Sequence, residues 1–319
     1  MNWRGPKPWG RQCDAAISLE QSLATAWPLT AHAQQHPTPV VAFLKSTTPD
    51  DSAHLVRAFR QGLSEAGFAE GRNVTIEYRW AENQLDRLPE LVTELVRRRV
   101  AVIATPADTP ATLVAKATTA TIPIVFEIGG DPVRAGLVAS FNQPGGNVTG
   151  ITSMNLELNA KLLGLLHELL PQAARFAVLV NPNNSTIAEA TITDARAAAM
   201  SIGRQIEVLT ASTNREIDMV FASLRPKQVD ALLVNNDPFF NSRREMVEAG
   251  GLMSYGANLP DLVRQAGVYS GRVLKGERPA DLPVLRATKF ELVINLQTAK
   301  TFGLVVPPTL LARADEVIE

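Results

Sequence analysis

The hydrophobic and polar positions of this chain follow two alternating patterns from Pro39 onward. Short runs that are apolar throughout, such as residues 40–44 (VVAFL), are typical of strands buried on both faces of a parallel sheet. Between these runs lie stretches such as residues 85–98, whose apolar side chains recur at helical spacing and share one face. Strands and helices that alternate in this way predict an α/β architecture with parallel, doubly wound sheets.

The pattern predicts two such units in tandem. Strands of the first unit are expected at residues 40–44, 74–80, 100–104, 122–126 and 148–151, with helices at 50–66, 85–98, 109–119 and 133–140. Strands of the second are expected at 176–180, 206–209 and 229–234, with helices at 155–170, 187–202 and 215–224. A helix at 259–275, a strand at 289–295, a helix at 297–302 and a short tail follow. Because no low-complexity linker separates the units, we expect two lobes packed against each other.

Residues 1–38 do not fit this pattern and are predicted to form a leader or disordered segment with the remnant of a signal peptide. The sequence Ala31-His32-Ala33, followed by Gln34, has the small-x-small form of a signal-peptidase site. The apolar segment before it is interrupted by Glu20. Two locations therefore stay open: the periplasm if the leader directs export, and the cytoplasm if it does not.

Composition narrows the functions that such a chain can have. A formal net charge of -1 creates no field that would attract nucleic acid or an anionic membrane. No run of about 18 apolar residues is present to span a membrane. The single cysteine cannot form a disulfide within the chain, and the four histidines lack the spacing of a metal site. We expect no nucleic-acid partner, no metal and no cofactor, and a monomeric protein.

The candidate binding residues follow the carboxyl ends of the predicted strands. In open parallel sheets, ligands bind beyond these ends, where the loops of neighbouring strands meet. The loops here carry hydroxyls, amides and carboxylates, which suit a small zwitterion: N–H groups at helix N-termini hold a carboxylate, and Asp131 or Asp237 can hold an ammonium. The candidates are Ser46, Thr47, Thr105, Ala107, Gly130, Asp131, Pro132, Asn181, Asn183, Asn236 and Asp237.

Each of these loops also admits a purely structural interpretation, because Asp-Pro and Asn-Pro before a helix are ordinary turn and capping sequences. The argument for binding depends on five such loops meeting at one edge, which capping alone does not require. Catalysis is the weakest alternative. The sequence lacks a G-x-G-x-x-G turn, a Walker loop and a G-x-S-x-G elbow, and Asp131 with Asp237 is a nonspecific acid–base pattern. We therefore expect a binding protein and not an enzyme.

Several segments resemble the substrate-binding proteins of ABC transporters, in the family that includes tryptophan/tyrosine-type receptors. The most specific segment is NQPGGNVTG at residues 142–150. The resemblance runs from about Pro39 to Glu319. It is also carried by FRQGL (59–63), YRWAE (78–82), IPIVF (122–126), GDPV (130–133), GLVAS (136–140), GGLMSYG (250–256) and LRATKF (285–290).

The resemblance implies the type I periplasmic-binding fold, in which two Rossmann-like lobes joined by three crossovers close by hinge motion on a ligand between them. Lobe 1 is then residues 39–150 with 256–285, and lobe 2 is residues 151–255 with 286–319. Tyr255 lies at a hinge and joins the candidate ligand-binding residues. The implied ligand is an amino acid or related zwitterion, and the implied partner is the membrane permease of the transporter.

The chain departs from the family just before Gly250. Only about fifteen residues separate that glycine from the strand that ends near Asn235. A parallel crossover with its helix needs at least about 10–12 residues, which leaves no room for a further strand. The second lobe is therefore expected to lack a βα unit after Glu245.

Three alternatives to a transport receptor stay open. A protein of the same fold can sense a ligand for regulation, and a trimmed second lobe can leave a truncated, nonfunctional copy. A doubly wound enzyme is the least favoured alternative. The sequence does not name the ligand, because the pocket depends on tertiary placement.

Overall fold

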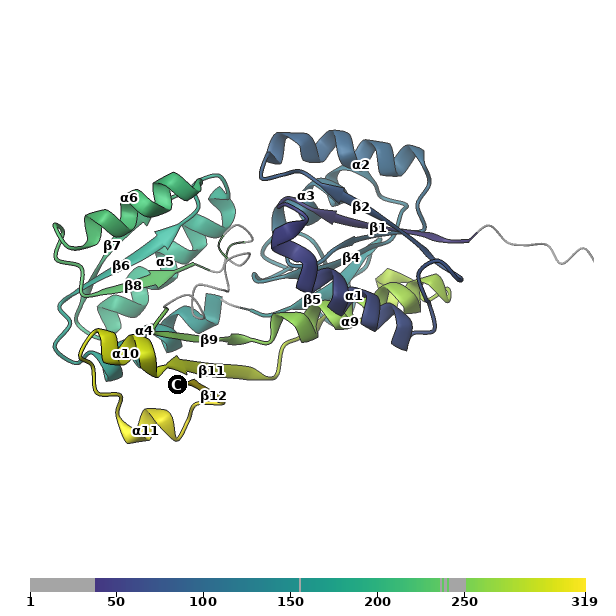
Figure 1. The fold of residues 1–319 in the computed structure, drawn as a ribbon. Helices are drawn as coiled ribbons and strands as arrows, with labels where there is room; N and C mark the ends of the chain where they lie inside the picture. The colour runs from purple at the N-terminus through teal and green to yellow at the C-terminus, as the bar shows by residue number, and fades with distance from the viewer. Residues whose placement is uncertain (1–37, 155, 236, 238–239, 241–250) are drawn as a thin grey trace, which may run out of the picture. The chain divides into compact units, whose positions relative to one another are not determined.

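The computed structural model describes residues 38–154, 156–235, 237, 240 and 251–319. The first lobe, as named here, is a sheet with the strand order β10-β5-β4-β3-β1-β2 and the helices that cover it (Figure 1). All of its strand pairs are parallel, and β1 pairs with β2 from Val40–Thr75 to Lys45–Trp80. The strands are β1 (Val40–Lys45), β2 (Thr75–Trp80), β3 (Val102–Thr105), β4 (Ile124–Ile128), β5 (Val148–Thr152) and β10 (Leu285–Arg286).

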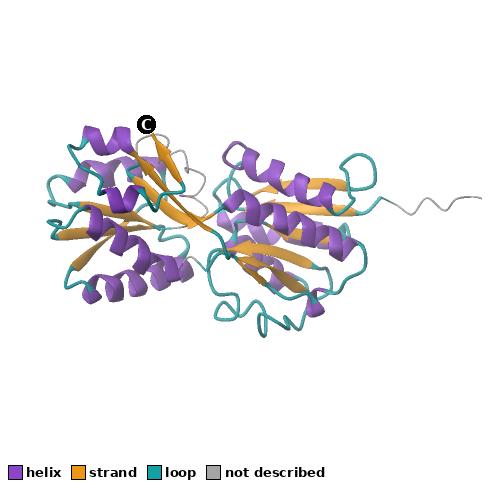
Figure 2. Ribbon diagram, turned by 90° about the horizontal axis from the view of Figure 1, so that it is seen from below, coloured by secondary structure: helices purple, strands orange, loops and turns teal. Residues whose placement is uncertain are grey.

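Helices cover both faces of this sheet (Figure 2). On one face, Phe43 of β1 packs in a cluster with residues of the helices α1 and α9. On the other face, Leu44 packs in a cluster with residues of α2 and α3. The apolar run of β1 is therefore buried from both sides, which confirms the doubly wound arrangement. The helices are α1 (Ala53–Glu65), α2 (Leu88–Arg97), α3 (Thr109–Thr118) and α9 (Leu259–Leu274), with short 3₁₀ turns η1 (Asp50–Ser52), η2 (Leu85–Arg87) and η3 (Pro279–Asp281).

The second lobe contains a parallel sheet with the strand order β7-β6-β8 in the described part of the chain. Helices α4 and α5 contribute to the cluster on one face, and α6 contributes to the cluster on the other. The elements are α4 (Leu156–Leu169), β6 (Arg175–Val180), α5 (Ser185–Ser201), β7 (Gln205–Thr210), α6 (Asn214–Leu224) and β8 (Ala231–Val234).

A separate small sheet completes the second lobe with the strand order β12-β11-β9. Its pairing is mixed, because β11 is antiparallel to β9 and parallel to β12. Its cluster includes residues of α4. The elements are β9 (Met253–Ala257), β11 (Phe290–Asn295), α10 (Leu296–Thr301), α11 (Pro308–Leu311) and β12 (Glu316–Ile318). The sequence pattern predicts a short tail after Phe302, and in the structure this tail contains α11 and β12.

Residues 133–140 form turns and not the predicted short helix. The Asp131 carboxylate accepts hydrogen bonds from the N–H groups of Val133 and Arg134, and Leu137 N–H donates to the Pro132 carbonyl. Gly136 has a φ of 67°. A helix cannot continue through a left-handed residue, so the segment folds back as a loop.

The predicted loss of a βα unit after Glu245 concerns residues 241–250, which lie outside the described residues. The described strands on either side of this segment, β8 and β9, belong to different sheets. The lobe boundaries at residues 150–151, 255–256 and 285–286 stay a prediction.

Candidate functional site

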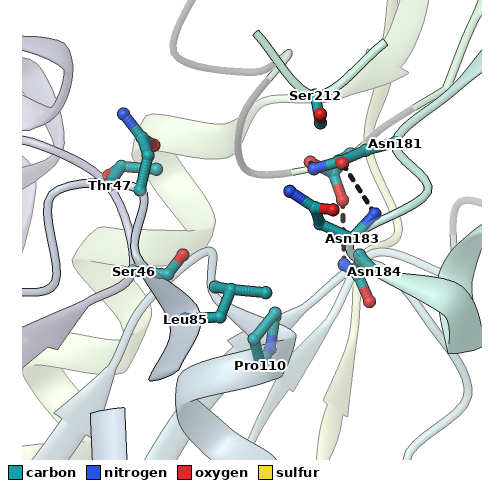
Figure 3. Close-up of a pocket in the computed structure, with 10 residues that line it drawn as sticks. Ser46, Thr47, Leu85, Pro110, Asn181, Asn183, Asn184 and Ser212 are labelled. Carbon is teal, nitrogen blue, oxygen red and sulfur yellow. Dashed lines mark hydrogen bonds between the residues drawn. The ribbon is translucent and has the colours of Figure 1, made fainter. Parts of the chain in front are cut away.

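A pocket lies at the carboxyl ends of strands from both lobes (Figure 3). Its first-lobe wall follows β1 and β2 and includes the start of α3. Its second-lobe wall follows β6, β7 and β8. Among the described residues, the lining comprises Ser46, Thr47, Asn83, Leu85, Pro110, Asn181, Asn183, Asn184, Ser212 and Asp237. The position agrees with the rule that ligands bind beyond the carboxyl ends of parallel strands.

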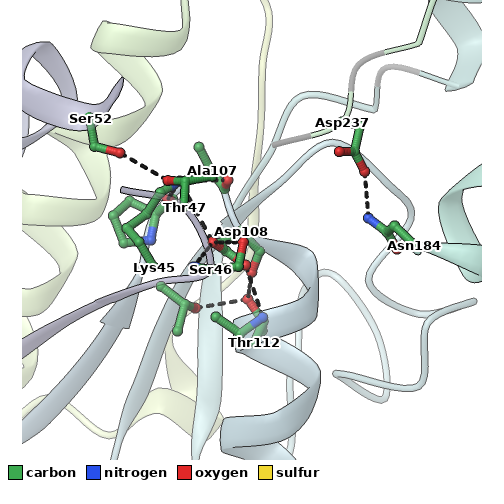
Figure 4. Close-up of polar contacts among 12 residues, drawn as sticks. Lys45, Ser46, Thr47, Ser52, Ala107, Asp108, Thr112, Asn184 and Asp237 are labelled. Atoms are coloured by element: carbon green, nitrogen blue, oxygen red, sulfur yellow. Dashed lines mark hydrogen bonds and ion pairs between the residues drawn. The ribbon is translucent and has the colours of Figure 1, made fainter. Parts of the chain in front are cut away.

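The loop after β1 forms one wall of the pocket. Hydrogen bonds to the buried side chain of Asp108 fix the conformation of this loop. Ser46 donates both its backbone N–H and its hydroxyl to Asp108 Oδ2, at 2.6 and 2.7 Å (Figure 4). Asp108 also caps α3, because Oδ1 accepts the Ala111 N–H at 2.9 Å. Asn83 N–H donates to the Ser46 carbonyl at 2.7 Å, which ties the loop after β2 to the same wall.

A buried ammonium group lies beneath this wall. Lys45 Nζ donates to the carbonyls of Pro106 and Ala107 at 3.0 and 2.9 Å, and lies 3.8 Å from Asp108 Oδ2. Burial lowers the pKa of Lys45, and the negative charges of Asp108, Glu127 and Asp237 oppose that effect. The ammonium therefore supplies a positive charge that compensates these buried carboxylates.

Glu127 is the second buried titratable group of this cluster. Burial raises the pKa of Glu127 to about 7, while the Lys45 charge and hydrogen bonds from the Ala107 backbone and the Ser153 side chain partly counteract the rise. The carboxyl is 1% exposed and lies on β4. The protonation state of Glu127 therefore changes within the physiological pH range.

The opposite wall is built around Asp237. Asn181 Nδ2 donates to Asp237 Oδ1 at 3.0 Å. Asn184 Nδ2 donates to Asp237 Oδ2 at 2.8 Å (Figure 4). Asn181 Oδ1 accepts the Asn183 N–H at 3.1 Å, which closes the turn after β6. Asn184 is the N-cap residue of α5, yet its side chain makes no capping bond. The two amides thus hold one carboxylate at the pocket and leave the helix end without a side-chain cap.

Ser212 completes this wall after β7. It donates its backbone N–H and its hydroxyl to Glu216 Oε2, at 2.7 and 2.9 Å. These hydrogen bonds lower the pKa of Glu216. Thr213 caps α6 through a hydrogen bond from Glu216 N–H.

The structure brings together part of the predicted set. Ser46, Thr47, Asn181, Asn183 and Asp237 line the pocket. Asn236 lies outside the described residues.

The remaining candidates lie apart from the pocket lining and have other partners. Thr105 bonds to the Thr112 hydroxyl, and the Ala107 carbonyl accepts from Lys45. The Gly130 carbonyl accepts from Thr152. Asp131 and Pro132 stabilise the turns described above, and Tyr255 of β9 stacks on Phe290 with ring centroids 6.1 Å apart.

Several pocket residues are missing from the predicted set. Asn184 ends the same Asn-rich turn as Asn181, so the sequence contained its signal. Ser212 follows the predicted strand at residues 206–209, and the rule of strand ends applied there would have found it. Nothing in the local pattern marks Asn83, Leu85 and Pro110, because their place in the lining depends on how the loops fold.

Two other site classes are not supported by the described residues. Within them, no group of three or more His, Cys, Asp or Glu side chains is arranged to hold a metal ion. Over the same residues, no helix combines the length and apolar character needed to cross a membrane.

Known proteins share both the sequence pattern and the fold. A tyrosine-binding protein of Clostridioides difficile (strain R20291) is 29% identical over 269 residues, which is 78% of this chain and 76% of that protein. A conserved domain protein from Vibrio cholerae has a TM-score of 0.80 at 25% identity, covering 88% of this chain and 99% of its own. An ABC domain from Streptococcus pneumonia in complex with L-Trp has a TM-score of 0.76 at 25% identity, covering 88% of this chain and all of its own.

The family assignment follows from the match along the chain. The family model for ABC transporter substrate binding proteins matches residues 40–318, which include every described strand and helix. The two-lobed α/β fold agrees with that of the solved relatives. This chain belongs to the ABC transporter substrate binding protein family.

Proposed function

We propose that this chain is the solute receptor of an ABC uptake transporter and binds an amino acid, or a related zwitterion, in the pocket of Figure 3. The proposal depends on one observation above all. The strand ends of both lobes contribute to one pocket, and its second-lobe wall includes the Asp237 carboxylate. A ligand that contacts both walls favours the closed arrangement of the lobes, which is how a receptor signals that it is loaded.

The two ends of a zwitterion have separate places in this proposal. Asp237 holds the ammonium, because a charge-assisted hydrogen bond in a partly dry pocket is stronger than a neutral one. The N-terminus of α5 holds the carboxylate, because Asn184 leaves that helix end without a side-chain cap. Relatives support the ligand class, since one is a tyrosine-binding protein and another is solved with L-Trp.

Ligand binding is tested by thermal shift and calorimetry on the full chain with the twenty amino acids. We expect L-tyrosine or L-tryptophan to raise the melting temperature and to bind with one site per chain, without turnover. If none of the twenty shifts the melting temperature, the ligand class is wrong. If the protein itself shows no cooperative unfolding, the truncated-copy alternative is favoured.

The transport partner and the location are part of the same proposal. We infer that the loaded receptor docks on an ABC permease and acts in the periplasm. Osmotic-shock fractionation of cells that express the full chain checks the location, and a cytoplasmic fraction would contradict it. Crosslinking in the presence of L-tyrosine checks the partner, because a permease subunit is expected and a sensor kinase would favour the regulatory alternative.

A further inference from the structure

Two serines of the pocket have the same hydrogen-bonding arrangement, one in each lobe. Ser46 donates its N–H and its hydroxyl to one oxygen of Asp108, and Ser212 donates both groups to one oxygen of Glu216. Both serines line the pocket, from opposite walls in Figure 3, whereas Asp108 and Glu216 do not belong to its lining. Each carboxylate therefore lies outside the pocket lining and contacts a serine that lines the pocket.

The direction of these hydrogen bonds determines what the serines can do for a ligand. An ionised carboxylate only accepts, so each hydroxyl proton points at its carboxylate and only oxygen lone pairs remain for the pocket. The backbone N–H groups of Ser46 and Ser212 are occupied in the same way. Neither serine is then available as a donor to a ligand carboxylate.

Asp108 accepts hydrogen bonds on both oxygens of its carboxylate. Its oxygens accept from the backbone of Ser46 and Ala111, and the Lys45 ammonium lies 3.8 Å from Oδ2. Glu216 lies in the first turn of α6, where the N-terminal end of the helix favours a negative charge. Together with Asp237, the two walls present hydrogen-bond acceptors to the ligand.

We propose that Asp108 and Glu216 are specificity-determining positioning residues: they orient the hydroxyls of Ser46 and Ser212 as acceptors, so that the pocket selects a ligand for its ammonium group. This inference rests on the proposed binding function and deepens it. The ammonium contributes more to affinity than the carboxylate, because acceptors from both lobes can surround it.

The first test uses the wild-type full chain and six probes in calorimetry. These are L-tyrosine and L-tryptophan, their amines (tyramine and tryptamine) and their acids without the amino group (3-(4-hydroxyphenyl)propionate and indole-3-propionate). We expect each amine to bind at least about tenfold more tightly than the matching acid, which is the size of one hydrogen bond to a charged group. Acids that bind as tightly as the amines overturn the inference.

The second test asks whether each carboxylate acts through its serine hydroxyl. A double-mutant cycle combines Glu216→Ala with Ser212→Ala, and a second combines Asp108→Ala with Ser46→Ala. Alanine removes the acceptor, so the serine hydroxyl proton is free to turn toward the ligand. We expect each carboxylate-to-alanine variant to weaken L-tyrosine binding about tenfold alone and far less when the serine is already alanine.

Equal losses in both backgrounds show a merely structural role and overturn the inference. Glu207→Ala on β7 is the matched control, because it makes the same change at an exposed carboxylate that pairs with Lys227 and does not line the pocket. If Asp108→Ala fails to fold, the Glu216 cycle and the six probes decide alone. If the wild-type protein binds neither amino acid, the proposed function has failed. If it binds an amino acid but the cycles show no coupling between each carboxylate and its serine, only this further inference has failed.

Discussion

At the scale of single residues, the pocket depends on groups whose charge state is set by burial. Lys45, Asp108 and Glu127 are each 2% exposed or less, and they lie beneath the loop that forms the first wall. A buried carboxyl that ionises must be compensated, and Lys45 is the nearby cation that lowers the pKa of Glu127. The stability of the first lobe therefore depends on the protonation state of this cluster.

Glu127 gives the stability of the protein a definite pH dependence. Because its folded pKa of about 7 lies above its ordinary value of 4.5, its contribution is fully present below pH 4.5 and is lost as the pH rises through about 7. The shift corresponds to about 3 kcal/mol. We expect Glu127→Gln to remove this fall from the curve of unfolding free energy against pH, measured with urea. The exposed variant Glu90→Gln is the control and keeps the fall, and a Glu127→Gln curve parallel to wild type would contradict the assignment.

Asp237 is the residue whose loss should affect binding most. In Asp237→Asn, the carboxylate that would hold the ammonium is gone, and an amide meets the donors of Asn181 and Asn184. We expect affinity for L-tyrosine to fall by about 100-fold, as for a lost hydrogen bond to a charged group. Calorimetry measures the change and circular dichroism checks the fold. An affinity equal to wild type in a folded variant would remove Asp237 from the site.

At the scale of elements, two helices of the first lobe touch at glycines. An added Cβ at Gly62 of α1 would lie 1.8 Å from the Arg264 carbonyl oxygen, and one at Gly267 of α9 would lie 2.2 Å from the Phe59 carbonyl oxygen. Such distances require the helices to separate. The helical pattern predicts both helices, but only their packing explains why glycine stands inside each.

We expect Gly62→Ala and Gly267→Ala each to lower the unfolding free energy by at least about 1–3 kcal/mol, because the contact is overpacked. Gly164 in α4 is the matched control, since nothing lies within 4 Å of its added Cβ. There the same substitution should stabilise the protein by about 0.5–1 kcal/mol through helix propensity. Chemical denaturation measures all three, and a stable Gly62→Ala protein would show that α1 and α9 are not in this contact.

At the scale of the whole molecule, the pocket requires both lobes. A ligand that binds only the folded protein stabilises it by about 2.7 kcal/mol when its concentration is 100 times the dissociation constant. We expect this stabilisation with L-tyrosine to be reduced by Asn83→Ala in the first wall and by Asn183→Ala in the second. Thermal shift measures both, with Glu90→Gln as the unaffected control. A loss confined to one wall would mean that the ligand binds a single lobe.

Hydrophobic periodicity by itself determined the two α/β units, most of their strands and helices, and the sheet edge at which to look for a site. It missed β9 and β10. Apolar runs such as residues 40–44 can be satisfied only between two layers of helices, so the pattern leaves little choice. It placed a helix at residues 133–140, where the Asp131 carboxylate and the left-handed Gly136 form turns instead.

Only the tertiary structure decided which strand-end residues share a pocket. Asp131 and Asp237 both precede a proline after a predicted strand. The Asp131 carboxylate accepts hydrogen bonds within its own turn, whereas side-chain amides hold the Asp237 carboxylate at the pocket. Asp108, buried and absent from the predicted set, fixes the orientation of Ser46 across 62 positions of sequence. Hydrogen bonds between distant segments leave no periodic trace, because their geometry depends on how the loops meet and not on which residues are neighbours in the chain.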